Sequence, residues 1–251
     1  MPNSYCEFSE EKPLTEIQAL IFDFGGTLDA NGIHWRDRFF RLIKGEFPDI
    51  DWETFEKADR NSIEKFISKK PVHLSLRASA HEIMTGIVKD LGLRQEIVNP
   101  LVSSFCRDTS FSLEQNRGWL ATLDSQFQLG VISNNFGNTL GWCDEYGLSP
   151  LLDVVVDSTV VGISKPDPRI FQIALSELEI SPEKAIYVGD TFLDDVVGAK
   201  RAGMFSAWLV GQEKKECPDT SLTDLQLFQL RDLEKFLQIP KESRAGDTKS
   251  D

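Results

Sequence analysis

The stretch IQALIFDFGGTLD, residues 17–29, joins an apolar run to a turn that carries two glycines and two aspartates. A short, nearly continuous apolar run is typical of a strand whose two faces are both covered, as in a parallel sheet. Asp23 stands at the end of this run, and open α/β sheets bind ligands outside the carboxyl ends of their strands. The stretch therefore predicts a buried first strand that carries Asp23 to a functional edge.

Four further segments have the same buried, β-branched composition. They are FQLGVIS from 127, LLDVVV from 151, AIYVG from 185 and FSAWLV from 205. Helix-like segments lie between them, and the clearest is DPRIFQIALSELEI, where Asp167 suits an N-cap and Pro168 suits the first helical position. This alternation predicts an α/β fold with a parallel sheet and right-handed crossovers.

The interval 31–112 interrupts this alternation, because it holds several amphipathic helical stretches and no convincing strand. About four helices are expected there, enough for a small bundle domain inserted after the first strand. We predict a core of residues 1–30 and 113–240, a helical cap over 31–112, and a polar, disordered tail over 241–251.

The overall composition fits an ordinary globular protein. Of the 251 residues, 41% are hydrophobic and 27% are charged, which is enough to bury a sizeable core. A formal net charge of −13 argues against binding to nucleic acid or to an anionic membrane surface. No run approaches the roughly 18 apolar residues that span a bilayer, and the first residues lack the pattern of a signal peptide. We therefore expect a cytoplasmic protein without a nucleic-acid or membrane partner.

Polar side chains follow the other predicted strands as well. Ser133 and Asn134 follow the second, Lys165 lies after the third, and Asp190, Asp194 and Asp195 follow the fourth. Each alone has an ordinary explanation as a turn or cap residue. Together they place several carboxylates at one edge, where ions about 4 Å apart repel by roughly 4 kcal/mol per pair at an effective dielectric of 20. The edge therefore predicts a bound cation or a shared proton.

The chemistry of this edge suits phosphoryl transfer. A few carboxylates with room for water are typical of a Mg²⁺ site. Lys165 and Ser133 would supply a positive charge and a hydrogen-bond donor to an anion beside the metal. Asp23, at the tip of the first strand, is the natural nucleophile.

Four blocks of sequence carry a family resemblance: DFGGTLD at 23–29, VISN at 131–134, SKPDPRIF at 164–171 and VGDTFLDDVVGAKRAG at 188–203. In this order they resemble the motifs of the haloacid dehalogenase (HAD) superfamily of phosphatases and related hydrolases, over about residues 17–210. The helical insertion looks like the cap of the branch known as C1, subfamily I. The resemblance implies a Rossmann-like core with strand order 5-4-1-2-3.

The resemblance also implies roles for single residues. Asp23 would form an aspartyl-phosphate, Ser133 and Lys165 would hold phosphoryl oxygens, Asn134 and Thr27 would support the substrate and its loop, and Asp23, Asp190, Asp195 and the carbonyl of Gly25 would bind Mg²⁺. Asp194 is expected to lie outside the metal site. The implied reaction is Mg²⁺-dependent hydrolysis of a small phosphorylated metabolite. The resemblance decides neither the substrate nor between monomer and homodimer.

Position 25 departs from the family pattern. Phosphatases of this superfamily usually carry an aspartate there, which protonates the leaving oxygen, and such proton transfer is typically worth about 10²–10⁴-fold. Gly25 cannot transfer a proton, although both glycines suit a tight turn with positive φ. Asp29, His34 or Arg36 could replace the acid, or Asp29 could cap a turn and His34 lie at the surface.

Two other functions stay open. One is a catalytically impaired regulator that binds phosphate, because the acid is missing. The other is halide displacement from a 2-haloacid, against which the acidic pair in VGDTFLDD argues. Arginines 36, 38 and 77 in the cap are possible contacts for an anionic substrate, or exposed helix residues.

Overall fold

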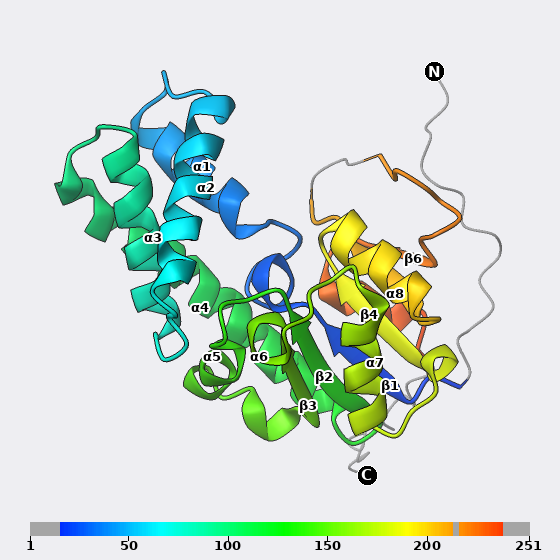
Figure 1. The fold of residues 1–251 in the computed structure, drawn as a ribbon. Helices are drawn as coiled ribbons and strands as arrows, with labels where there is room; N and C mark the ends of the chain where they lie inside the picture. Colours follow the sequence, from blue (N-terminus) through cyan, green and yellow to red (C-terminus); the bar gives the residue numbers. More distant parts are fainter. Residues whose placement is uncertain (1–15, 213–215, 238–251) are drawn as a thin grey trace, which may run out of the picture.

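The computed structural model describes residues 16–212 and 216–237. Six parallel strands form one sheet in the order β3-β2-β1-β4-β5-β6 (Figure 1). They are β1 Ala19–Phe22, β2 Gln128–Ser133, β3 Val154–Asp157, β4 Ala185–Gly189, β5 Phe205–Leu209 and β6 Leu225–Leu227. The five predicted strands and their order are confirmed. The sheet has one strand more than predicted, since β6 spans three residues and is too short to show a pattern.

Both faces of the sheet are covered, as the apolar runs predict. In β1, Ala19 and Ile21 belong to the core on the side of α7, whereas Leu20 and Phe22 belong to the core on the side of α4. All four side chains are fully buried. Helix α7 is Pro168–Glu177, and the Asp167 side chain caps it as predicted. The other core helices are α5 Thr139–Glu145, α6 Ser158–Val161 and α8 Gly198–Arg201.

Four α-helices separate β1 from β2, in the interval where the sequence predicts amphipathic helices. They are α1 Trp35–Glu46, α2 Trp52–Ser68, α3 Leu76–Asp90 and α4 Val98–Leu123. Helices α1 to α3 stand beside the sheet, and α4 runs from them to the sheet (Figure 1). We call the helical segment before residue 113 the cap. One apolar cluster contains residues of the cap and of the sheet face on the side of α4, so the cap and the sheet are packed together.

Helix α4 belongs to both parts of the molecule. It has 26 residues and continues without a break through residue 112, where the sequence suggested a boundary. Near its end, Trp119 packs edge-on against Phe22 of β1, with ring centroids 6.0 Å apart. The division at residue 112 stays a prediction that falls inside a helix, and the predicted tail 241–251 lies outside the described residues. Among those residues, no helix is both long and apolar enough to cross a membrane.

Candidate active site

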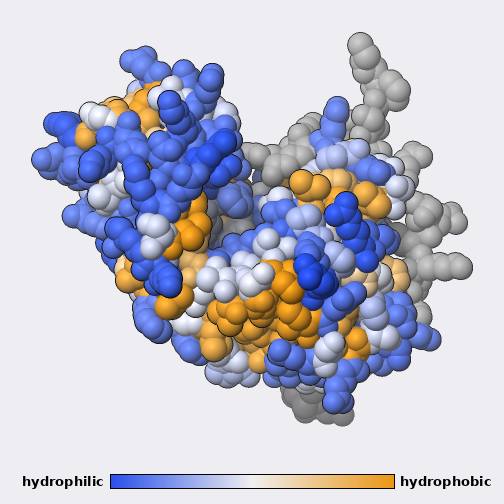
Figure 2. All heavy atoms as spheres, viewed as in Figure 1, coloured by the Kyte–Doolittle hydropathy of each residue, from blue (hydrophilic) through white to orange (hydrophobic). Residues whose placement is uncertain are grey.

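A cavity of about 110 Å³ lies between the cap and the carboxyl ends of β1, β2 and β4. Figure 2 shows the molecule hollowed between these two parts. From the core, Asp23, Ser133, Lys165 and Asp195 line the cavity, so the predicted convergence of strand ends is present. Strand β1 lies between β2 and β4, where the strand order reverses, and α/β proteins bind ligands at such a point.

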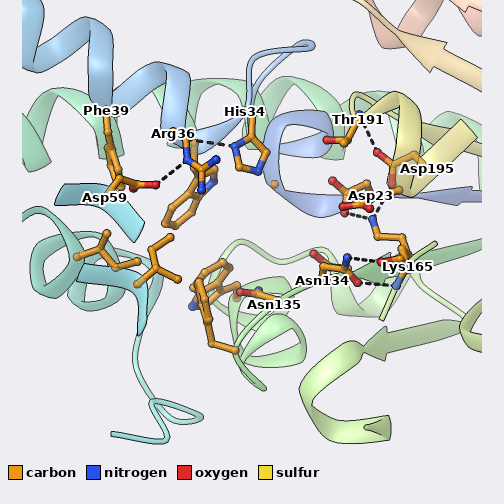
Figure 3. Close-up of a pocket in the computed structure, with 18 residues that line it drawn as sticks. Asp23, His34, Arg36, Phe39, Asp59, Asn134, Asn135, Lys165, Thr191 and Asp195 are labelled. Atoms are coloured by element: carbon orange, nitrogen blue, oxygen red, sulfur yellow. Dashed lines mark hydrogen bonds and ion pairs between the residues drawn. The ribbon is translucent and has the colours of Figure 1, made fainter. Parts of the chain in front are cut away.

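Three carboxylates gather around one lysine at the core end of the cavity. Asp23, Asp190 and Asp195 are buried, and each places an oxygen within 4.8 Å of the others. The Lys165 ammonium donates hydrogen bonds of 2.7 Å to Asp23 Oδ1 and of 2.7 Å to Asp195 Oδ1. It also donates to the hydroxyl of Tyr187 at 2.9 Å. Figure 3 shows Asp23, Asp195 and Lys165 pointing toward one another.

With all three carboxylates ionised, the cluster would hold more negative charge than Lys165 can balance. Burial raises the pKa of Asp23 to about 7; Lys165 opposes this shift and Asp195 adds to it. Burial, followed by the charge of Asp23, holds the pKa of Asp190 well above its usual range. Burial lowers the pKa of Lys165, but Asp195 and Asp23 outweigh it and hold this pKa well above its usual value. A buried set of carboxylate oxygens with surplus negative charge fits Mg²⁺.

The turn after β1 needs a glycine at position 26 and tolerates other residues at position 25. Gly26 has φ +91°, and a Cβ there would lie 2.6 Å from Asp190 Oδ2. Gly25 has φ −79° and ψ 114°, and a Cβ there would come no closer than 3.7 Å to the Trp35 indole. The backbone of the turn requires a glycine at position 26 but not at position 25. The absence of an acid at position 25 is therefore not imposed by the backbone.

Asp29 is not available as a substitute acid. Its fully buried carboxylate accepts hydrogen bonds from the Gly26 amide at 2.6 Å, from the Trp35 indole N–H and from Arg38 Nη1 at 3.0 Å. Arg38 also donates to Thr109 Oγ1 at 2.6 Å. Asp29 and Arg38 therefore join the turn after β1 to α1 and α4. Arg38 serves this network, and Arg77 donates to Ser103 at an exposed position, so neither lines the cavity.

Replacing Asp29 with asparagine is expected to destabilise the fold by about 3–5 kcal/mol, because it leaves the buried charge of Arg38 without its partner. Urea unfolding would measure the loss. The matched control is Asp108→Asn, whose partner Arg107 lies 3.8 Å away in an exposed pair and whose loss should cost less than about 1 kcal/mol. Equal, small losses in both variants would contradict the structural role of Asp29.

His34 lines the cavity beside Gly25. Its Nδ1 accepts a hydrogen bond of 3.3 Å from the Arg36 amide, so it caps α1. The His34 side chain is exposed to solvent, yet many protein atoms lie around its ring. The desolvation that these atoms cause, followed by the charge of Arg36, lowers the pKa of His34. With Nδ1 as acceptor, the neutral ring carries its proton on Nε2. His34 can thus donate a hydrogen bond into the cavity, but a neutral imidazole is a weak acid.

Two residues predicted to contact substrate have supporting positions. The Asn134 amide group bonds the Lys165 backbone twice, donating to its carbonyl at 3.0 Å and accepting from its N–H at 2.9 Å. Thr27 is fully buried and donates to Asp190 Oδ1 at 3.4 Å. Thr27 does not line the cavity, and its hydroxyl supports the Asp190 carboxylate, so its role in holding substrate stays a prediction. Asn134 lines the cavity and keeps Lys165 in place.

Sequence reasoning missed two residues that line the cavity, Asp59 and Trp142. Asp59 on α2 lines it and accepts a hydrogen bond of 2.6 Å from Arg36 Nε. Trp142 on α5 also lines it and stacks on Trp35 with ring centroids 5.3 Å apart and planes 6° apart. A signal for Asp59 existed, because it shares the buried face of α2 with Phe55 and Phe66 at helical spacing.

Sequence comparisons identify the family of this chain. The family model for haloacid dehalogenase-like hydrolases matches residues 17–203. The glyceraldehyde 3-phosphate phosphatase of Methanopyrus kandleri is 31% identical over 240 residues, covering 90% of this chain and 98% of the relative. The phosphoserine phosphatase of Thermus thermophilus is 40% identical over 87 residues, but that match covers 35% of the chain and spans only 34% of the relative.

Solved structures share the fold at low sequence identity. A dehalogenase crystallised as an intermediate complex has a TM-score of 0.61 at 18% identity, over 89% of this chain and 98% of its own. A HAD-hydrolase of Bacillus subtilis bound to magnesium has a TM-score of 0.57 at 18% identity, over 90% of this chain and 100% of its own. These likenesses concern the fold, and membership rests on the family model and the full-length relative. The chain belongs to the haloacid dehalogenase-like hydrolase family.

Proposed function

We propose that this protein is a Mg²⁺-dependent phosphatase of a small phosphorylated metabolite, with Asp23 as nucleophile. The observation that carries the proposal is the buried cluster in which Lys165 bonds both Asp23 and Asp195 at the cavity. Asp23, Asp190, Asp195 and the carbonyl of Gly25 would hold the ion. When bound, Mg²⁺ supplies positive charge that offsets the charge on the phosphoryl oxygens.

The residues of the chain divide the remaining work. A carboxylate oxygen of Asp23 forms a bond to phosphorus while the bond from phosphorus to the ester oxygen breaks, which leaves an aspartyl-phosphate. Lys165 holds Asp23 in position, and with Ser133 it would bind phosphoryl oxygens. Water then cleaves the acyl phosphate and restores the carboxylate. Because position 25 carries no acid, proton transfer in both steps falls to water or to the substrate, and turnover is expected to be slow.

The relatives support phosphate monoesters as the substrate class. The two relatives are named glyceraldehyde 3-phosphate phosphatase and phosphoserine phosphatase, and both names refer to phosphate esters of three-carbon compounds. The match to the first covers 98% of that relative. The cavity of about 110 Å³ has room for a small molecule but not for a polymer. For comparison, a single water needs about 10–15 Å³ of such a volume. We therefore propose a small phosphorylated metabolite as the substrate.

Phosphate release from a panel of phosphate monoesters is expected with Mg²⁺ and is expected to fall at least about 10²-fold when the ion is chelated. The reason is that three buried carboxylates repel both one another and the substrate without a cation. Restoring Mg²⁺ should restore the rate, which controls for damage by the chelator. Chelator-resistant release of chloride from 2-chloropropionate, without phosphate release, would instead support halide displacement.

Gly25 favours one alternative, a regulator that binds phosphate esters without hydrolysing them. Calorimetry with Mg²⁺ separates the two functions. Binding of a phosphorylated metabolite that persists for hours without release of phosphate would support the regulator, whereas binding followed by release supports the phosphatase.

A further inference from the structure

The cap end of the cavity contains a charged pair that the proposed chemistry at Asp23 does not use. The Asp59 side chain is 1% exposed and lines the cavity. Its Oδ2 accepts the hydrogen bond of 2.6 Å from Arg36 Nε. Its Oδ1 is buried and has no hydrogen-bond partner among the described residues. Figure 3 shows Asp59 and Asp23 at opposite ends of the cavity, with His34 between them.

A buried carboxylate oxygen without a partner needs an explanation, because it has given up its bonds to water and gained none from protein. Burial raises the pKa of Asp59, and the bond from Arg36 opposes this shift; in the ionised form both oxygens are acceptors. The apolar side chains Phe39, Ile63 and Ile83 line the same end of the cavity and offer no donor. Oδ1 can therefore accept a hydrogen bond from water or from a molecule that fills the cavity and displaces that water.

The charges around this pair limit what that molecule can be. At the cap end, Arg36 faces Asp59 at 2.6 Å and Glu56 at 3.8 Å, and Glu56 also pairs with the exposed Arg60 at 3.5 Å. The two carboxylates therefore balance two guanidinium groups, so this cluster has no surplus positive charge to attract a second phosphate or a carboxylate. A hydroxyl or an ammonium group satisfies Oδ1 without adding negative charge.

We propose that Asp59 is a specificity residue, which accepts a hydrogen bond at Oδ1 from a hydroxyl or ammonium group on the organic part of the substrate. The substrate class is thus a phosphate monoester of an alcohol or amino alcohol that carries this donor away from the phosphate. The inference rests on the proposed function for the position of the phosphate beside Asp23. Arg36 acts as a positioning residue, since it holds Asp59 through Oδ2.

Binding of unhydrolysable analogues tests this without requiring turnover. The probes are alkylphosphonates of three to six carbons whose far end carries an ammonium, a hydroxyl or a hydrogen atom. Calorimetry with Mg²⁺ is expected to show that, at one or more lengths, the wild type binds a donor-bearing chain about ten-fold or more tighter than the matched unsubstituted chain. The ammonium and hydroxyl series identify which donor the cavity accepts.

Two variants show whether Asp59 causes this preference. Asp59→Asn keeps an acceptor for Arg36 but turns an amide donor toward the cavity, so the preference should fall to within about two-fold while the unsubstituted chain binds as before. Glu64→Gln removes an exposed carboxylate from the same helix and should leave the preference unchanged. Absence of preference in the wild type, or the same preference in Asp59→Asn, overturns the inference. Failure to hydrolyse the matching phosphate esters would contradict the proposed function. The preference measured by binding would still decide the role of Asp59.

Discussion

Asp23→Asn is expected to lower phosphate release on the order of 10³-fold or more. The amide keeps the shape of the side chain but is not a nucleophile, and it weakens the proposed Mg²⁺ site by removing one of three carboxylates. Initial rates with Mg²⁺ measure the loss. Mass spectrometry after an acid quench should find one added phosphate on the peptide that contains Asp23 in the wild type, and none in the variant.

Asp194→Asn is the matched control for this experiment. Asp194 also lines the cavity, and burial raises its pKa, but it is not part of the three-carboxylate cluster. Its replacement should change the rate only a few-fold. If Asp23→Asn keeps activity near that of the wild type, Asp23 is not the nucleophile and the proposed function fails.

Gly25→Asp is expected to speed turnover about 10²-fold. The backbone at position 25 suits an L residue, and a Cβ would meet the Trp35 ring at an ordinary 3.7 Å. Because Gly25 lines the cavity with Asp23, a carboxyl group there can protonate the leaving oxygen and then activate water, a role worth about 10²–10⁴-fold. Single-turnover kinetics should show faster formation and loss of the phosphorylated Asp23.

Gly25→Asn separates proton transfer from mere filling of the space. Asparagine has nearly the same size as aspartate but no acidic proton, so this variant should stay at the wild-type rate or below it. Equal acceleration by both variants would mean that packing against Trp35, and not proton transfer, limits the wild type. Slower turnover in both would point to a substrate that needs the space above Gly25.

The sheet and its functional edge were predictable from the sequence because local signals determine them. Each of the five longer strands is a compact apolar run, and parallel strands place the residues that follow them at one edge. That rule alone brings Asp23, Ser133, Lys165 and Asp190 to the same place. Strand β6 lacked such a signal, since its three residues are ordered by pairing with β5.

The cap end of the site was not predictable in this way. Asp59 lines the cavity because tertiary packing brings α2 beside the start of α1, where Asp59 accepts the hydrogen bond from Arg36, and no local pattern encodes that placement. The status of Asp29 was equally hidden, because Arg38 on α1 and Thr109 on α4 complete its network from distant parts of the chain. That position 25 can accept a larger residue follows only from its dihedral angles and from the free space beside it.

The stacked pair of Trp35 and Trp142 gives the protein a built-in optical probe. Trp35 begins the first cap helix and Trp142 lies on a core helix, so their overlap depends on how the two parts are placed. Parallel indoles at 5.3 Å couple their electronic transitions, and this coupling weakens when the rings separate or tilt. Near-ultraviolet circular dichroism can therefore follow the approach of cap and core in the unlabelled protein, at the wall of the cavity itself.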